Sequence, residues 1–141
     1  LQEVNRRQRQ MCIRDQLVEH TLEKPWNFTL PNVKINKIEA VGNKYWIATN
    51  QGLISLDSST NKQRNLSRNV NSDLPSNIIN DLNFDGESLW VATNRGLAIT
   101  DSDSNIQTVI NHNNAFSSGL QDSNITNIFI SRMSTAWIGT A

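Results

Sequence analysis

The sequence has a single cysteine, no excess of charge of either sign and no long apolar run. Because Cys12 stands alone, the chain can form neither a disulfide framework nor a thiolate metal site. Its 13 basic and 13 acidic residues balance, so it lacks the positive field that binds nucleic acid or an anionic membrane. No apolar run approaches the roughly 18–20 residues that cross a bilayer. We therefore expect no nucleic-acid partner and no membrane segment in this chain.

The strong helix-forming residues are also comparatively scarce. Ala, Leu and Glu are outnumbered by Asn, Ser and Thr, which favour turns and loops. This composition indicates an all-β protein with many turns.

One apolar phrase recurs along the chain. It reads YWIATNQGLISLD at residues 45–57 and LWVATNRGLAITD at residues 89–101, and it starts again as AWIGTA at the end. A leucine precedes the tryptophan of each copy by 16 or 17 residues. A period near 45 residues indicates a repeat architecture. We predict repeat units at residues 30–73, 74–119 and 120–141, with the third cut off and the residues before the first belonging to a preceding unit.

The second unit has the pattern of four short strands. They are expected at residues 78–84, 88–93, 97–101 and 106–111. Asp85-Gly86 is a strong hairpin signal, and Gly96 suits the left-handed position of a three-residue bulged turn, NRG. Four antiparallel strands in a repeat of this length are typical of a propeller blade. We predict an all-β fold: a β-propeller fragment of about two and a half four-stranded antiparallel blades, covering residues 25–141.

The run LWVAT explains why the phrase repeats. It does not alternate between apolar and polar residues, which is the pattern of a strand buried on both faces. A blade lies between two neighbours, so each copy supplies the surface that buries the next. Trp46, Trp90 and Trp137 share one position of this strand, so we expect equivalent, buried packing roles rather than stacking on sugars. Trp26, nearer a loop, is expected to pack as well.

Residues 74–101, LPSNIINDLNFDGESLWVATNRGLAITD, strongly resemble the two-component regulator propeller repeat. That family's pattern is approximately L-P-S-N-x-V-x-x-I-x-x-D-x-x-G-x-L-W-I-G-T-x-x-G-L. The third unit has lost the Pro and the Asp-Gly turn and carries one extra residue before its tryptophan, and the first unit has Gly42-Asn43 in place of Asp-Gly. The matching positions of the second unit are Leu74, Pro75, Ser76, Asn77, Ile79, Leu82, Asp85, Gly86, Leu89, Trp90, Thr93, Gly96 and Leu97.

The resemblance implies a periplasmic or extracellular sensor domain. Such repeats are common in the ectodomains of bacterial hybrid two-component sensor histidine kinases, many of which sense glycan breakdown products. It implies an oligosaccharide ligand, contacts with neighbouring blades of the parent propeller and a parent protein able to form a homodimer. Other members of the family are surface scaffolds or secretion-apparatus proteins without a kinase.

Residues 1–24 match no blade strand. The string RRQRQMCIRD resembles one that arises when sequencing-adapter DNA is translated within a reading frame. The alternative is a native strand of a preceding blade or a linker, and both interpretations stay open. We assign no function to the residues concerned, which are Arg6, Arg7, Arg9, Cys12 and Arg14.

Several oxygen-rich stretches resemble ligand sites but have simpler explanations. DSDSN at residues 101–105 starts like a calcium loop, yet Ile106 stands where Gly is expected and His112 where Glu is expected. The first unit has DSSTN at residues 57–61, which lacks the middle Asp. A hairpin turn explains both copies. We read Asp81 and Asp85 as turn residues too.

Nothing in the sequence indicates catalysis, a metal or a cofactor. Three N-x-S/T sequons are as many as chance allows in a chain this rich in Asn, Ser and Thr. The two histidines lack metal-ligand neighbours, and there is no nucleophile motif, phosphate loop or zinc spacing. The residues weighed and set aside are Asn27, Asn65, Asn124, His20 and His112.

We therefore predict a fragment of a periplasmic ligand-sensing propeller from a bacterial two-component regulator. The alternatives are a surface scaffold or secretion component, and a propeller enzyme such as a lyase. Ligand specificity is expected in the segments that differ between units, residues 59–73 and 104–119, since the repeated phrases hold the scaffold. The first segment carries Lys62, Arg64 and Arg68, whereas the second carries no basic Lys or Arg.

Overall fold

The computed structural model describes residues 32–68, 73–101, 103, 105–111 and 120–141, together with the backbone of two short strands nearer the N-terminus. The chain divides into two compact units, Leu1–Ile35 and Asn36–Ala141. In the first unit, β1 (Cys12–Ile13) pairs with β2 (Gln16–Leu17) in antiparallel fashion. Trp26, Asn27, the two histidines and the N-terminal arginines lie outside the described residues.

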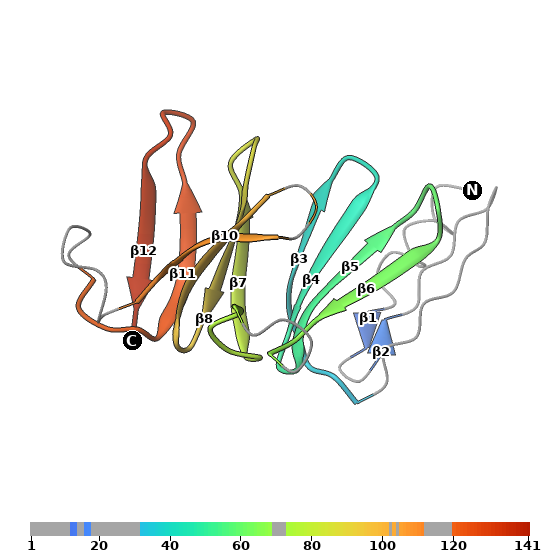
Figure 1. Ribbon diagram of the computed structural model, residues 1–141, viewed down its shortest axis with the longest axis horizontal. Coiled ribbons are helices and arrows are strands. Elements are labelled where there is room, and N and C mark those ends of the chain that lie inside the picture. Colours follow the sequence, from blue (N-terminus) through green and yellow to red (C-terminus); the bar gives the residue numbers. More distant parts are fainter. Residues whose placement is uncertain are drawn as a thin grey trace. The chain divides into compact units, whose positions relative to one another are not determined.

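The other strands form three antiparallel sheets whose strands follow one another in sequence order (Figure 1). The first sheet is β3 (Ile35–Val41), β4 (Lys44–Thr49), β5 (Gly52–Asp57) and β6 (Lys62–Leu66). The second is β7 (Ile79–Phe84), β8 (Leu89–Thr93), β9 (Gly96–Thr100) and β10 (Ile106–Ile110). The third is β11 (Ile125–Ile130) and β12 (Ala136–Thr140).

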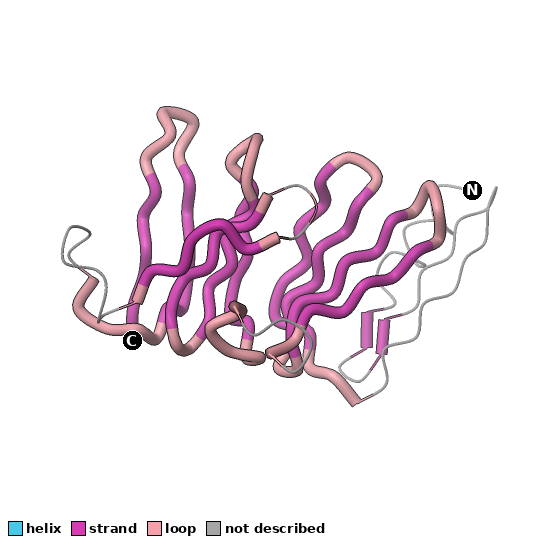
Figure 2. Tube along the Cα trace, viewed as in Figure 1, coloured by secondary structure: helices cyan, strands magenta, loops and turns pink. Residues whose placement is uncertain are grey.

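This arrangement confirms the predicted all-β fold of four-stranded blades and a partial third one. No strand of the second sheet begins or ends more than one residue away from its expected range. Figure 2 shows strands joined by turns throughout the described part, and no helix there is long and apolar enough to span a membrane.

The turn between the two middle strands of each complete sheet is built by the repeated Thr and Gly. The hydroxyl of Thr49 donates to the carbonyl of Gly52 at 2.6 Å and accepts from the backbone N–H two residues ahead at 3.0 Å. Thr93 makes the same two bonds, at 2.7 and 3.1 Å, with Gly96 and Arg95. Both hydroxyls are fully buried, so they satisfy backbone groups that water cannot reach.

The expected three-residue turn NRG is one residue shorter in the structure. Thr93 pairs directly with Gly96, which leaves Asn94-Arg95 as the turn and makes the glycine the first residue of β9. The glycine does have the expected positive φ, at 137°. The Thr hydroxyl closes the turn in place of the bulge that we had predicted, and the sequence pattern alone did not distinguish the two.

The first strands of the second and third sheets share an irregularity. Ile79 pairs with Thr93, but Asp81 pairs with Ala92, so Asn80 is an extra residue in β7. A shift at the equivalent place makes Thr126 an extra residue in β11. A bulge re-aims the side chain of its extra residue, and the Asn80 side chain makes a contact with the next sheet that is described below.

Apolar contacts between sheets form the core. Trp46, Ala48 and Leu53 of the first sheet pack with residues of the second that include Leu89 and Val91. The opposite face of the second sheet packs on the third through Trp90, Ala92, Leu97, Ile110, Ile125, Ile128, Ile130 and Ile138. Residues of β8 therefore alternate between two neighbouring sheets, which explains the uninterrupted apolar run and confirms burial on both faces.

The three repeated tryptophans occupy equivalent strand positions but differ in burial. Trp46 is 3% exposed and Trp90 is partly buried, whereas Trp137 is 66% exposed. The prediction of burial is thus wrong for Trp137. The physical reason is that Trp46 and Trp90 each face the next sheet, while no described sheet covers the face of β12 that carries Trp137 and its cross-strand neighbour Phe129, itself 61% exposed.

Replacement of Gly96 by Ala should lower the free energy of unfolding by roughly 2–4 kcal/mol. A Cβ there would lie 2.8 Å from the carbonyl oxygen of Ile110, on a backbone with φ of 137°. Gly42→Ala is the matched control, because its φ of 60° suits the left-handed region and nothing lies within 4 Å, so it should cost about 1 kcal/mol. Urea unfolding measures both, and equal losses would contradict the steric argument.

The isolated chain should self-associate, because Phe129 and Trp137 leave an apolar sheet face open. Sedimentation velocity should show an apparent mass that rises with concentration. Replacing both residues by Thr, which keeps strand propensity, should reduce that rise. A sharp, concentration-independent thermal transition of a monomer would contradict the prediction.

Candidate functional site

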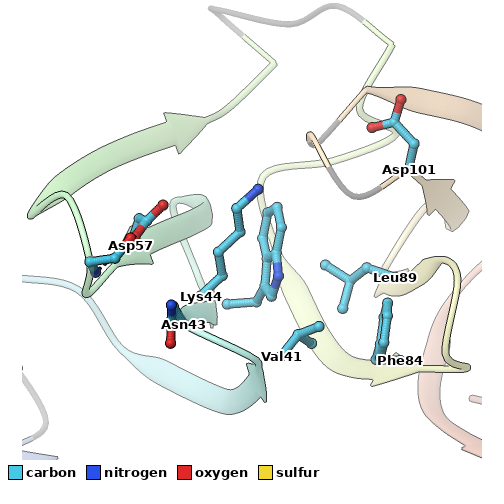
Figure 3. Close-up of a pocket in the computed structure, with 9 residues that line it drawn as sticks. Val41, Asn43, Lys44, Asp57, Phe84, Leu89 and Asp101 are labelled. Carbon is cyan, nitrogen blue, oxygen red and sulfur yellow. Dashed lines mark hydrogen bonds between the residues drawn. The ribbon is translucent and has the colours of Figure 1, made fainter.

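A cleft of about 340 Å³ lies between the first and second sheets, at the end where β3 turns into β4 and β9 turns into β10. Figure 3 shows Asp57 and Asp101 on opposite sides of this cleft, with Lys44 between them. The other residues that line it are Val41, Asn43, Trp46, Ser59, Phe84 and Leu89. The cleft thus combines an apolar floor with charged and amide groups at its rim.

Both carboxylates of the cleft are fastened by their own turns. The Oδ1 atom of Asp57 accepts bonds from the Ser59 hydroxyl at 2.5 Å, the Ser59 N–H at 2.9 Å and the Thr60 N–H at 3.2 Å. Asp101 accepts from the side chain and N–H of Asn105, at 3.0 and 2.9 Å, and from two further groups. These bonds lower the pKa of both carboxyls below the ordinary 3.8, so both are ionised near neutral pH. The side-chain bond from Ser59 contributes most for Asp57, and the side-chain bond from Asn105 contributes most for Asp101.

The turn explanation of DSSTN and DSDSN is therefore supported by the geometry. In both stretches the first Asp binds N–H groups two to four residues ahead, as an Asx turn does. Among the described residues, no three His, Cys, Asp or Glu side chains gather closely enough to hold a metal ion. His112, the residue at the twelfth position of the calcium pattern, lies outside those residues.

The tryptophans of the first two sheets differ in what their indole N–H groups meet. The Trp90 N–H donates to Oδ2 of Asp85 at 2.8 Å. Asp85 also caps its hairpin by accepting from the N–H groups of Glu87 and Ser88, at 2.8 and 2.7 Å. The residue five positions before Trp46 is Val41, which has no acceptor, and no described residue accepts a bond from the Trp46 N–H. Among the sheets that the structure describes, the second alone has the Asp–Trp pair.

Two basic residues of the first sheet hold the β9–β10 turn of the second. The Lys44 ammonium lies 3.7 Å from Oδ1 of Asp103, and the Arg64 guanidinium donates to the Asp103 carbonyl at 3.0 Å. Arg64 belongs to the variable segment 59–73 and lies in strand β6. Part of that segment thus fixes one wall of the cleft, which the sequence pattern did not reveal because the partner is on the next repeat.

Polar side chains on the first strands of the first two sheets reach the backbone of the next sheet. Asn36 donates to the carbonyl of Ile79, and Asn80 donates to the carbonyl of Ile125, each at 2.7 Å. The donors are 44 residues apart, so this contact repeats with the sequence period. These bonds fix how far one sheet slides along the next, which apolar packing alone leaves loose.

Asp81 is not the turn residue that we predicted. It lies inside β7 and is 8% exposed, and its Oδ2 accepts from the Ile128 N–H of the third sheet at 2.8 Å. Its Oδ1 accepts from the Leu82 N–H and lies 3.8 Å from the Lys37 ammonium of the first sheet. A buried carboxylate needs such partners, so Asp81 is a link between three sheets.

Close by, burial raises the pKa of Glu39 above 4.5, while Lys37 and the N–H of Phe84 act in the opposite direction. Glu39 is on β3 and Phe84 is on β7, so this carboxylate too contacts the next sheet. The acidic and basic groups of the first strands are therefore engaged in contacts between sheets. The sequence contained a signal for these contacts between sheets, because polar residues interrupt the apolar pattern at the same places in INKIE (residues 35–39) and INDLN (residues 79–83).

Comparison with solved structures finds the same fold in sensor ectodomains. The chain matches the extracellular domain of a protein assigned to a hybrid two-component system from B. thetaiotaomicron, with 22% identity over 78% of this chain and a TM-score of 0.63. It also matches two structures of another extracellular domain from that organism, described once as a one-component and once as a hybrid two-component system. Their identities are 22% and 17%, each over 90% of this chain, with TM-scores of 0.67 and 0.66.

These matches cover only 15–18% of the length of the solved chains, so the protein spans about a sixth of such an ectodomain. A scan against family models finds no match, and neither does a search of curated proteins. The shared fold agrees with the two-component regulator propellers that the repeat resembles.

Acid should weaken the three turns capped by Asp57, Asp85 and Asp101. Burial acts to raise the pKa of Asp85, but the N–H groups of Ser88, Glu87 and Trp90 outweigh it, so its pKa also lies below 3.8. A folded pKa below the unfolded one means stability that is present above pH ~4 and is lost as pH falls through the folded value. Glu39, whose pKa is raised, contributes in the opposite sense, with stability lost as pH rises through its folded pKa.

Carboxyl NMR titration checks both signs in one experiment. The three aspartates should titrate below 3.8 and Glu39 above 4.5. An Asp85→Asn variant should show a shallower loss of stability in acid than the unaltered chain. A titration of Asp85 at or above its ordinary value would refute the proposed capping.

Proposed function

We propose that the chain is part of an extracytoplasmic ligand-sensing propeller and that the ligand of the intact protein is an oligosaccharide derived from a glycan. The observation that carries the proposal is the repeat LPSN…DG…LW…T…GL, which resembles two-component regulator propellers and folds as the solved sensor ectodomains do. Because the chain spans about a sixth of those ectodomains, the kinase, the ligand and the periplasmic location belong to the proposal.

The distribution of burial supports binding at the strand ends rather than on the strands. The middle strands β4, β5, β8 and β9 are buried almost throughout, and in the second sheet neighbouring sheets cover both faces of β8 and β9. Exposed side chains lie at turns and on the outer strands β3 and β6, and β6 belongs to a segment that differs between repeats. A ligand therefore meets turns and segment 59–73 before it meets the repeated phrase.

The charged groups offer little support for an enzyme. Asp57, Asp85 and Asp101 cap turns, and Asp81 bonds to the backbone of the next sheet. An enzyme that works through carboxyls alone has a pair with opposed pKa values that face a common substrate position. The lowered aspartates are committed to their own turns and Asp81 to contacts between sheets, so the residues support recognition better than catalysis.

Calorimetric titration of the complete ectodomain with a panel of glycan fragments tests the proposal. At least one neutral or charged oligosaccharide should bind, and Lys62→Ala with Arg68→Ala, both in the variable segment, should weaken binding. Trp90→Phe is the matched scaffold variant and should leave affinity unchanged while lowering thermal stability.

Two outcomes would count against the proposal. If the loop variants bind normally while a folded Trp90→Phe protein loses binding, the division between scaffold and site is wrong. If no glycan binds, a surface scaffold or secretion component becomes the better assignment, and a reading frame that continues into a secretion sorting domain rather than a kinase would support it.

A further inference from the structure

We infer that the cleft between the first and second sheets holds one neutral sugar residue, with the Trp46 N–H and the Asp57 carboxylate as its main hydrogen-bonding partners. This inference rests on the proposed function, since it assigns a site and a sugar class to the sensing role. The cleft volume of about 340 Å³ lies near the lower end of the roughly 300–1,000 Å³ typical of small-molecule pockets.

The first argument is an unpaired donor in the cleft wall. Trp46 is 97% buried, since only 3% of it is exposed, yet its N–H has no acceptor among the described residues. Its counterpart Trp90 has one in Asp85, and the first repeat carries Val41 at that position. Oδ1 of Asn94 is the one buried side-chain polar atom of the described residues that lacks a partner, so the unpaired Trp46 N–H is open to solvent. Because Trp46 lines the cleft, this N–H can donate to a ligand oxygen in place of water.

The second argument is an acceptor on the same sheet as that donor. All three bonds that fasten Asp57 end on Oδ1, which leaves its Oδ2 atom for a donor from outside the turn. Asp57 lines the same cleft, and its carboxylate is held by its turn before any ligand arrives. An ionised carboxylate oxygen accepts strongly from hydroxyl groups. The cleft therefore presents one fixed donor and one fixed acceptor.

The third argument is the apolar floor. Val41, Phe84 and Leu89 line the cleft beneath the polar rim (Figure 3). A ligand that meets hydroxyl-binding groups on one side and apolar surface on the other is amphipathic, as a pyranose ring with its C–H face is. A purely apolar ligand would displace water from the charged groups of Asp57 and Lys44 and give them no hydrogen bond in return.

The charge of the cleft selects against acidic sugars. Asp57 and Asp101 contribute two negative charges, while Lys44, the basic residue of the lining, lies 3.7 Å from Asp103 outside it. A uronate or sulfate group placed here would meet carboxylates with no uncommitted cation. This excess of negative charge is the reason that we infer a neutral sugar rather than an acidic one.

The test is NMR of the ¹⁵N-labelled chain, in which the four tryptophans give four indole signals. The probes are methyl glycosides of glucose, galactose and mannose, beside methyl glucuronide and methyl galacturonide. At least one neutral glycoside should shift the Trp46 signal, assigned with Trp46→Phe, and the Trp137 signal should stay in place. Neutral glycosides that leave the Trp46 signal unmoved, or uronides that shift it more, would overturn the inference.

Three variants locate the effect. Asp57→Asn keeps the turn oxygen but turns Oδ2 into a donor, so affinity should fall about tenfold or more. Asp122→Asn is the matched control, because that carboxylate also caps a turn, through the Asn124 N–H at 2.9 Å, but lies outside the cleft. Val41→Asp should give Trp46 the internal acceptor that Trp90 has, and so weaken sugar binding. Because Val41 packs against the core, the fold of this variant is checked by its NMR spectrum.

The same variants are made in the complete ectodomain, so that self-association of the short chain does not decide the outcome. If the ectodomain binds a glycan and Asp57→Asn, Val41→Asp and Asp122→Asn all bind as the parent does, this cleft is not the site, while the sensing function stands. If the ectodomain binds no glycan, the proposed function fails, and the indole titration still decides whether the cleft takes a sugar.

Discussion

The structure depends on one constraint: a sheet of this protein cannot bury its own faces and is completed by the sheet beside it. Residues of β8 alternate between the first and third sheets, so nearly every position on that strand is apolar and buried. The alternation explains the unbroken run LWVAT and the recurrence of its counterparts. It also explains why the tryptophan at one strand position ranges from 3% exposed in Trp46 to 66% exposed in Trp137, since exposure there depends on the neighbour.

Polar contacts give this packing its register. The amides of Asn36 and Asn80 bond to carbonyls of the following sheet at equal distances, and the Asp81 carboxylate bonds to the Ile128 N–H. Apolar faces attract without direction, whereas each of these bonds holds in one alignment only. The third repeat has Thr126 where the first two have Asn, so its shorter side chain ends the series within the described residues.

Positions that repeat and positions that differ have separate roles. Thr49 and Thr93, with Gly52 and Gly96, make the same turn twice, because the buried hydroxyl and the positive φ are both needed wherever two middle strands meet. The position of Asp85, in contrast, differs between the repeats, since the first repeat has Val41 there. The turn differs as well, since two residues join β3 to β4 and four join β7 to β8. The change removes the partner of an indole N–H, and the resulting unpaired donor lines the cleft. A departure from the repeat is thus a more informative pointer to a site than the repeat itself.

Much of the fold could be predicted from the sequence because its determinants are local. Period, turn residues and strand patterns depend on neighbours a few positions apart, and they located the strands of the second sheet to within about a residue. The turn residue Asp85 was identified in the same way, while the length of the Asn94-Arg95 turn was not, since a buried hydroxyl decided it.

Contacts between repeats were decided only in the tertiary structure. Asp81 looked like a turn residue because its partner is 47 positions away, and Arg64 looked like part of a variable loop because it bonds to Asp103 of the next sheet. The cleft has the same origin, since its walls come from β3, β4 and β5 on one side and β7, β8 and the end of β9 on the other. The sequence by itself determined which strands form and which residues build their turns, through local conformational preference. The packing of one sheet on the next determined which side chains are buried, paired or left open to a ligand, because those properties belong to two repeats at once.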